Sequence, residues 1–254
     1  MNWQFEDTGF RPGTFNMEYD EALAAWVMQG FAAPTVRVYG WDPNAISLGW
    51  SQPADEIDLT KAAKEGVDVV RRPTGGRAIF HSDEVTYSVV MPSDGKRVMS
   101  VYDDISRALV CGLRKLGVDA MIEKRQPHFP SEYRKPSSAA CFTSAARYEI
   151  QVNGKKLVGS AQRRYSMGNG EEIVLQHGSI LLSGDHQRIV DFLNASEVEK
   201  NYIQSELRKK TIDLSSVLGR RVEFDEVVES LKQGFEEAWS ITFDKTPEPI
   251  LVLR

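Results

Sequence analysis

The spacing of apolar side chains along this chain changes repeatedly between helical and extended periods. Residues 16–29 carry apolar side chains at helical spacing, and Asn16 is the expected N-cap of that helix. The longest helical pattern covers residues 99–116 and stops at Gly117. Shorter helices are predicted at residues 58–65, 187–194, 198–209 and 224–239. The chain from about residue 186 onward is therefore expected to be mainly helical.

Extended segments are predicted where apolar and polar positions alternate with a period of two residues. The predicted strands are residues 35–39, 46–49, 67–70, 86–91, 147–152, 156–162 and 174–182. The Asn153-Gly154 dipeptide that separates two of them is typical of a tight β-hairpin. Because hairpins outnumber strand–helix–strand crossovers, we expect an α+β fold with a mixed, largely antiparallel sheet flanked by helices. We expect residues 1–254 to form a single domain.

Composition narrows the class of protein. With 254 residues, of which 41% are hydrophobic and 26% charged, the chain resembles a globular protein with a substantial core. The formal net charge of -5 argues against a dedicated nucleic-acid-binding protein. No apolar stretch approaches the ~20 residues that span a bilayer, and the N-terminus lacks the layout of a secretion signal. We therefore expect no membrane partner. Since there are only 2 cysteines, we expect a cytoplasmic protein in which both thiols are free.

The segment from residue 71 to residue 81, which reads RRPTGGRAIFH, carries the most chemical information. The adjacent Gly75 and Gly76 let the backbone approach a ligand closely and permit positive φ angles. The guanidinium groups of Arg71 and Arg72 are planar donors for a phosphate, a carboxylate or a polarised carbonyl. The alternative is an ordinary hairpin turn, because a Gly-Gly pair between two strands is common there.

The two cysteines lie in different surroundings. Cys111 falls within the long predicted helix and is interpreted as a small core residue. Cys141 follows a proline-containing loop at residues 124–140, a length at which loops are often functional. It is a candidate nucleophile if positive charge nearby favours the thiolate, and otherwise a second core cysteine.

Lys156 is the candidate source of that charge. Strand alternation places Lys155 and Lys156 on opposite faces, so only one of them can face a binding site. Gly159, Ser160 and Ala161 on the same strand leave open space of the kind found at a pocket floor. The alternative is that both lysines form a solvated pair beside a hairpin turn.

The histidines give weaker signals. His81 and His177 each follow or interrupt an apolar strand without a second histidine or a carboxylate at ligand spacing. They are therefore interpreted as hydrogen-bonded structural residues, and no metal site is expected. Basic clusters at residues 163–164, 208–210 and 220–221 are either solvated surface or a docking patch for an acidic partner.

Together these segments resemble the biotin/lipoate A/B protein ligase family. The resemblance rests on the segment at residues 71–81, on KLVGSA at 156–161 and on HGSILL at 177–182, in this order. YGW at 39–41 and SLG at 47–49 also fit, so that the resemblance extends over roughly residues 1–240. It implies a fold similar to the catalytic domain of class II aminoacyl-tRNA synthetases and biotin ligases.

The family contains ATP-using lipoate–protein ligases and octanoyltransferases that need no cofactor. Ligases of this kind carry a Gly-Arg-Asn-Asp-like segment ahead of the lysine hairpin, whereas residues 140–149 read ACFTSAARYE. This segment is more similar to the octanoyltransferases that carry a cysteine after the loop. The resemblance therefore implies a cofactor-independent acyltransferase of lipoate biosynthesis, which moves an octanoyl group from acyl carrier protein to a lipoyl domain such as the glycine cleavage H protein. The alternatives are an ATP-dependent lipoate–protein ligase and, more remotely, a non-catalytic module that binds acyl groups or lipoyl domains.

The resemblance also implies roles for individual residues. Cys141 is the expected nucleophile, through an acyl-cysteine intermediate, and Lys156 its catalytic partner. The residues expected to bind substrate are Arg71, Arg72, Gly75, Gly76, Arg77, Ala78, His81, Gly159, Ser160, Ala161, His177 and Gly178.

Overall fold

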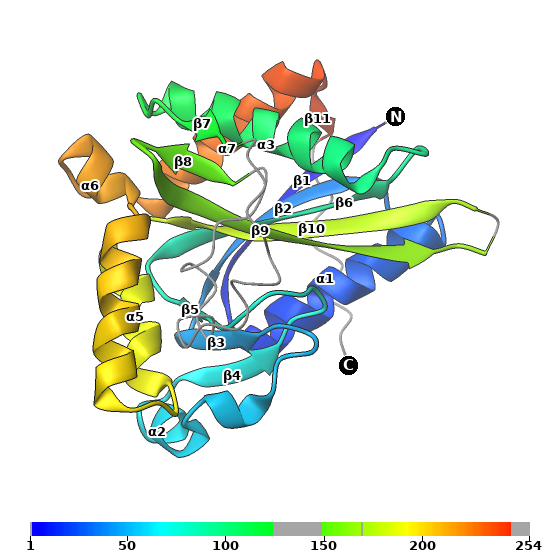
Figure 1. Ribbon diagram of the computed structural model, residues 1–254. Helices are drawn as coiled ribbons and strands as arrows, with labels where there is room; N and C mark the ends of the chain where they lie inside the picture. Colours follow the sequence, from blue (N-terminus) through cyan, green and yellow to red (C-terminus); the bar gives the residue numbers. More distant parts are fainter. Residues whose placement is uncertain (1, 124–148, 169, 245–254) are drawn as a thin grey trace.

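The computed structural model describes residues 2–123, 149–168 and 170–244, and two β-sheets organise them (Figure 1). The larger sheet has 8 strands in the order β11-β1-β2-β6-β10-β9-β8-β7, and the smaller has 3 in the order β4-β3-β5. The strands of the larger sheet are β1 (Trp3–Arg11), β2 (Thr35–Trp41), β6 (Glu84–Pro92), β7 (Met121–Ile122), β8 (Ile150–Val152), β9 (Lys155–Ser166), β10 (Glu172–Leu181) and β11 (Phe243–Asp244). The strands of the smaller sheet are β3 (Ala45–Leu48), β4 (Asp68–Arg71) and β5 (Ile79–His81).

Strand pairing confirms the predicted mixed, largely antiparallel architecture. In the larger sheet, β1 pairs in parallel with β2 and with β11. The neighbouring strands in the remaining sheet order, β2-β6-β10-β9-β8-β7, pair antiparallel. In the smaller sheet, β3 is parallel to β4 and antiparallel to β5. The hairpin predicted at Asn153-Gly154 joins β8 to β9.

Helices cover both faces of the larger sheet. The α-helices are α1 (Gly13–Met28), α2 (Leu59–Lys64), α3 (Val98–Lys115), α5 (Glu197–Lys210), α6 (Leu214–Leu218) and α7 (Phe224–Trp239). The 3-10 helices are η1 (Ala54–Glu56) and η4 (Gly184–Phe192). Helices α3 and α7 lie together on one face, while α1 and the smaller sheet lie on the other (Figure 1). No helix in the described ranges is both long and apolar enough to cross a lipid bilayer.

Two sequence predictions are corrected by the helix boundaries. The first helix begins at Gly13 and its N-cap is Pro12, so Asn16 is not a cap. Asn16 is instead fully buried, and its side-chain amide donates to the carbonyl oxygen of Gly40 at 3.0 Å. The segment predicted as a helix at residues 187–194 is helical only as far as Phe192, as part of the 3-10 helix η4.

The space that matters for function lies between the two sheets. The smaller sheet stands away from the larger one, held on one side by α1, which contacts β3 and β4. On the other side, η4 packs against β5 and α5 packs against β9. Strands β9 and β10 and the loop between β4 and β5 therefore face each other across a gap in which side chains from distant parts of the chain meet.

Candidate active site

A cavity of about 270 Å³ lies between the two sheets. Of the residues predicted to bind substrate or to act in catalysis, those that line it are Arg72, Gly75, Gly76, Arg77, His81, Lys156, Gly159, Ser160, Ala161, His177 and Gly178. Three segments separated widely in sequence thus meet around one cavity. Cys141 lies outside the described residues, and its role as a nucleophile remains a prediction.

The loop that carries Gly75 and Gly76 is held in place by Arg72. The Arg72 side chain is buried, and its Nη2 donates to the carbonyl oxygens of Gly75 at 2.9 Å and Arg77 at 2.8 Å. Its Nη1 donates to the carbonyl oxygen of Ser47 at 2.8 Å. Charge-assisted hydrogen bonds of this kind are roughly twice as strong as neutral ones. Arg72 therefore fixes the shape of the loop from inside.

The other two predicted arginines have separate structural partners. Arg71 does not line the cavity, because its Nη1 donates to three backbone carbonyls between Gly49 and Gln52, at distances of 2.7 to 2.9 Å. Arg77 lines the cavity and forms an ion pair with Glu56 at 2.6 Å. Ala78, also predicted to bind substrate, does not line the cavity and packs in the core of the smaller sheet.

The floor of the cavity is formed by small residues on β9 and β10. Gly178 pairs with Ser160, and Ser179 pairs with Gly159, across the two strands. A Cβ atom on Gly178 would lie 2.4 Å from the carbonyl oxygen of Gly159, a distance that no side chain tolerates. The prediction that Gly159, Ser160 and Ala161 lie beside Lys156 at a cavity is confirmed, since all four residues line it.

His81 and His177 are both hydrogen-bonded through both ring nitrogens. His81 contacts the Ser47 hydroxyl at 2.7 Å and the Glu84 carboxylate at 2.8 Å. Its ring stacks on Trp41, with 4.0 Å between the ring centroids. Burial raises the pKa of Glu84, but His81 and hydrogen bonds to that carboxylate hold it below its ordinary value. The predicted structural role of His81 is confirmed, and it also lines the cavity wall.

His177 connects the cavity to a buried ion pair in the core. Its Nε2 lies 2.6 Å from the Thr74 hydroxyl, and its Nδ1 lies 3.1 Å from the Asp20 carboxylate. Asp20 and Arg37 are both fully buried and pair at 2.7 Å. Burial raises the pKa of Asp20, but Arg37 and His177 outweigh it, so the net direction is downward. The Gly75-Gly76 loop is thus anchored, through Thr74 and His177, to a charge pair beneath the cavity.

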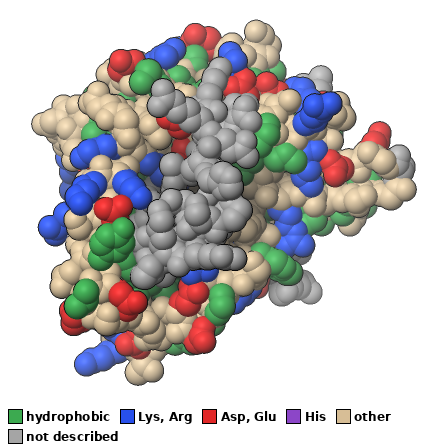
Figure 2. Space-filling view, viewed as in Figure 1, with side chains coloured by type: hydrophobic (Ala, Val, Ile, Leu, Met, Phe, Trp, Pro, Cys, Tyr) green, Lys and Arg blue, Asp and Glu red, His purple; other side chains and the backbone are tan. Residues whose placement is uncertain are grey.

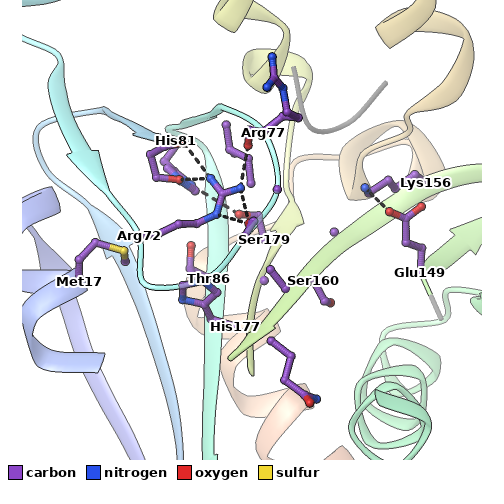
Figure 3. Close-up of a pocket in the computed structure, with 18 of the residues that line it drawn as sticks. Met17, Arg72, Arg77, His81, Thr86, Glu149, Lys156, Ser160, His177 and Ser179 are labelled. Carbon is purple, nitrogen blue, oxygen red and sulfur yellow. Dashed lines mark hydrogen bonds and ion pairs between the residues drawn. The ribbon is translucent and has the colours of Figure 1, made fainter. Parts of the chain in front are cut away.

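Lys156 and Glu149 form a buried ion pair at one end of the cavity (Figure 3). Both side chains line the cavity, and each is about 5% exposed or less. Lys155 points the other way and donates to the backbone carbonyl of Arg208 at 3.4 Å. The prediction that only one of the two lysines faces the site is therefore confirmed.

Apolar side chains close the opposite end of the cavity. Met17 lies across the cavity from Lys156 in Figure 3. It packs with Tyr39 and Trp41, which also line the cavity, in one buried cluster. The cavity therefore has a charged end and an apolar end, as a site for a short chain with a polar head group would.

Several of these residues were not identified from the sequence. Asp20 is absent from the residues predicted to form the site, although it lies on the same helix face as Met17 and Leu23. A charged residue within an apolar helical stripe was the available signal. Glu149 carried no such signal, because its partner becomes evident only when the β8–β9 hairpin is formed.

Cys111 is remote from this cavity. It lies on α3, partly exposed, and burial together with Glu237 raises the pKa of its thiol. A raised pKa disfavours the thiolate, so Cys111 has the character of an unreactive thiol.

Comparison with known proteins points to one family. The family model of the lipoyl protein ligase A/B catalytic domain matches residues 12–236. "Octanoyltransferase LipM" of Geobacillus kaustophilus is 38% identical over 95% of this chain and 88% of its own length. The proteins of the same name from an Exiguobacterium species and from Bacillus subtilis are 42% and 36% identical, over 90% and 94% of this chain and 83% and 87% of their own lengths.

Solved structures agree with this result. Lipoate-protein ligase A bound with ATP superimposes with a TM-score of 0.76 and 25% identity, over 97% of this chain and 89% of that one. A bipartite lipoate protein ligase from Thermoplasma acidophilum gives a TM-score of 0.75 and 25% identity, over 97% and 87% of the two chains. Because the family model and the relatives cover nearly the whole chain, this protein belongs to the lipoyl protein ligase A/B catalytic domain family.

Proposed function

We propose that this protein is an octanoyltransferase of lipoate biosynthesis. The observation that carries the proposal is the set of relatives named octanoyltransferase LipM, which match at 36–42% identity over at least 90% of this chain. The cavity supports it, because a slot of about 270 Å³ with one apolar end and one charged end suits a short acyl chain.

The proposed donor is octanoyl-acyl carrier protein, and the proposed acceptor is a lysine of a lipoyl domain, such as that of the glycine cleavage H protein. In the first step, the Cys141 thiolate attacks the octanoyl thioester on the carrier's phosphopantetheine arm. A new thioester to Cys141 forms, and the arm leaves as a thiol after taking up a proton. Exchange of one thioester for another is nearly thermoneutral and requires no nucleotide.

In the second step, the uncharged amine of the acceptor lysine attacks the octanoyl-Cys141 thioester. The C–S bond breaks and an amide forms, while the amine proton returns to the sulfur. Lys156 would favour the thiolate form of Cys141 and donate a hydrogen bond to the developing oxyanion in both steps. The buried carboxylate of Glu149 supports this role, because its ion pair with Lys156 holds the ammonium group in place at this end of the cavity.

The remaining cavity residues would position the acyl group. The N–H groups of Gly75 and Gly76 are proposed to hold the carbonyl end, in the loop that Arg72 fixes. The octanoyl chain would lie over Gly159 and Ala161 toward Met17. His81 and His177 belong to the cavity wall, where all four ring nitrogens already have partners.

A nucleotide-free transfer assay tests the proposal. Purified protein, octanoyl-carrier and apo acceptor are mixed without ATP, and the acceptor is weighed by mass spectrometry. We expect the acceptor to gain one octanoyl group, and we expect Cys141→Ala to abolish the gain. Undiminished octanoyl transfer by the Cys141→Ala variant would rule out the covalent mechanism.

An ATP-dependent lipoate–protein ligase is the second candidate, favoured by the likeness to a ligase solved with ATP. It predicts transfer from free octanoate or lipoate only with ATP, together with exchange of radiolabelled pyrophosphate into ATP. The third candidate, a non-catalytic binding module, predicts carrier or lipoyl-domain binding without any product. The three readings therefore give different results in the same set of assays.

A further inference from the structure

A second, shallow groove lies outside the acyl cavity, between the β8–β9 hairpin and the C-terminal half of α5. The residues that line it are Lys155, Asn201, Gln204, Ser205, Arg208 and Lys209. All six side chains carry an N–H or O–H donor, three of them are cations, and none of the six is a carboxylate. In a protein with a net charge of -5, such a lining favours an anion.

Nearby acids neutralise only part of this charge. Lys209 lies 3.6 Å from Glu206, which Lys210 approaches more closely, at 3.0 Å. Within the described ranges, neither Lys155 nor Arg208 forms an ion pair, and the Lys155 ammonium donates to the Arg208 carbonyl oxygen. Two of the three groove cations are therefore available to an anionic ligand.

The position of Lys155 argues for more than an ordinary helix end. Basic residues in the last turn of a helix complement its dipole, which is sufficient to explain Arg208 and Lys209. Lys155 comes from a strand, and its side chain is directed to the same groove. Figure 2 shows Lys and Arg side chains gathered on the side of the molecule where α5 lies.

The groove and the acyl cavity share one strand end. Lys155 precedes Lys156, and their side chains leave β9 on opposite faces. The segment after α5 is fastened at the same place, since the N–H of Ile212 donates to the Lys156 carbonyl oxygen at 3.0 Å. The groove and the cavity therefore lie on opposite faces of the first residues of β9.

We propose that this groove binds the phosphodiester of the donor's phosphopantetheine arm. The inference rests on the proposed function, in which that arm carries the octanoyl thioester. A phosphodiester bears a negative charge and several acceptor oxygens, which match two or three cations flanked by amide and hydroxyl donors. The lysine of a lipoyl acceptor has no phosphate beside it, so the groove fits the donor rather than the acceptor.

Carboxylates on the surface of an acidic carrier share this chemistry, and three donors separate the two sources. They are octanoyl-carrier protein, octanoyl-phosphopantetheine without the protein, and octanoyl-pantetheine without phosphate. The test variant is the double substitution Lys155→Ala with Arg208→Ala. The matched control is Lys64→Ala, which removes an exposed lysine from the last turn of α2, away from the groove.

The double variant should raise KM for octanoyl-carrier and for octanoyl-phosphopantetheine about tenfold, because two charge-assisted contacts are lost. We expect KM for octanoyl-pantetheine and kcat for every donor to stay close to those of the unmodified protein. Raising the salt concentration should weaken the unmodified protein's affinity for the phosphate-bearing donors more than that of the double variant. The Lys64→Ala control should behave as the unmodified protein in each assay.

Three results would overturn the assignment. An equal rise of KM for all three donors would mean that the hairpin itself is damaged. A rise confined to the intact carrier would assign the groove to acidic side chains on the carrier surface. A rise of KM for the acceptor alone would make it an acceptor site. If the unmodified protein transfers octanoyl from none of the donors, the proposed function fails first and this inference fails with it.

Discussion

Shortening Met17 should lengthen the acyl chain that the enzyme prefers. Met17 is about 5% exposed and closes the apolar end of the cavity, opposite Lys156 (Figure 3). Replacement by alanine removes three side-chain heavy atoms and leaves space where additional methylene groups can enter. The chain in the site should therefore grow from octanoyl toward decanoyl.

The size of the effect follows from burial of those methylene groups. Each buried methylene contributes about 0.8 kcal/mol, so the two extra groups of a decanoyl chain are worth about 1.6 kcal/mol. That free energy corresponds to a change of about 15-fold in the ratio of kcat/KM for decanoyl over octanoyl donors. The same substitution should lower the free energy of unfolding by about 2–5 kcal/mol, because it removes buried side-chain volume.

The assay is a competition between hexanoyl, octanoyl, decanoyl and dodecanoyl donors, with the mass of the acylated acceptor as the readout. Met28→Ala is the matched control, since Met28 lies on the same helix and is half-buried outside the cavity. Met17→Phe should shift the preference toward hexanoyl. An unchanged preference in Met17→Ala, equal to that of Met28→Ala, would refute the placement of the acyl terminus at Met17.

Three further predictions concern the supports of the cavity. Arg72→Lys keeps the positive charge but loses the planar set of donors to three carbonyls, so kcat/KM should fall at least about tenfold. Because the charge is unchanged, the loss would come from the missing hydrogen bonds, and unchanged kinetics would contradict this role of Arg72. A methyl group on Gly49 would lie 2.0 Å from the Gly76 carbonyl oxygen, whereas at Gly184 the nearest atom is 3.7 Å away. Gly49→Ala should therefore lose activity and lower Tm, and Gly184→Ala should change neither, as measured by transfer rate and calorimetry. Asp20→Asn should lower the free energy of unfolding by about 3–5 kcal/mol at pH 7, because a buried charge loses its partner. The pKa of Asp20 in the folded protein lies below its ordinary value of 3.8. The difference in unfolding free energy between the unmodified protein and Asp20→Asn should therefore shrink as the pH falls below 3.8. A difference that does not depend on pH would contradict the stabilising role of the ion pair.

Local signals in the sequence were sufficient for much of the fold. The helix predicted at residues 99–116 is α3 (Val98–Lys115), because its apolar stripe and terminal glycine are both local features. The hairpin at Asn153-Gly154 was predicted for the same reason. Strand β1 was missed although it alternates, because its partners in the sheet are distant in sequence. It pairs with β2 across helix α1 and with β11, whose residues begin at Phe243.

The sequence predicted which residues line the candidate site better than it predicted the hydrogen bonds that these residues form. Adjacent glycines, a lysine on one strand face and small residues beside it are readable from spacing, and they do meet around one cavity. The destination of a long side chain is not readable in this way. Arg71 and Arg72 donate to the backbone carbonyls of Gly49 and Ser47, which come near only because β3 pairs with β4 in the smaller sheet. The contact between Asp20 and His177 likewise joins residues 157 positions apart.

The most direct test of the central claim is the mass of the protein itself after mixing with octanoyl-carrier, without acceptor and without nucleotide. We expect one added octanoyl group, located on the peptide that contains Cys141, sensitive to hydroxylamine and retained in a Cys111→Ser variant. Subsequent addition of apo acceptor should remove it and produce the amide. No added group in a preparation that nevertheless modifies the acceptor, or an added group on Cys111, would rule out an acyl intermediate on Cys141.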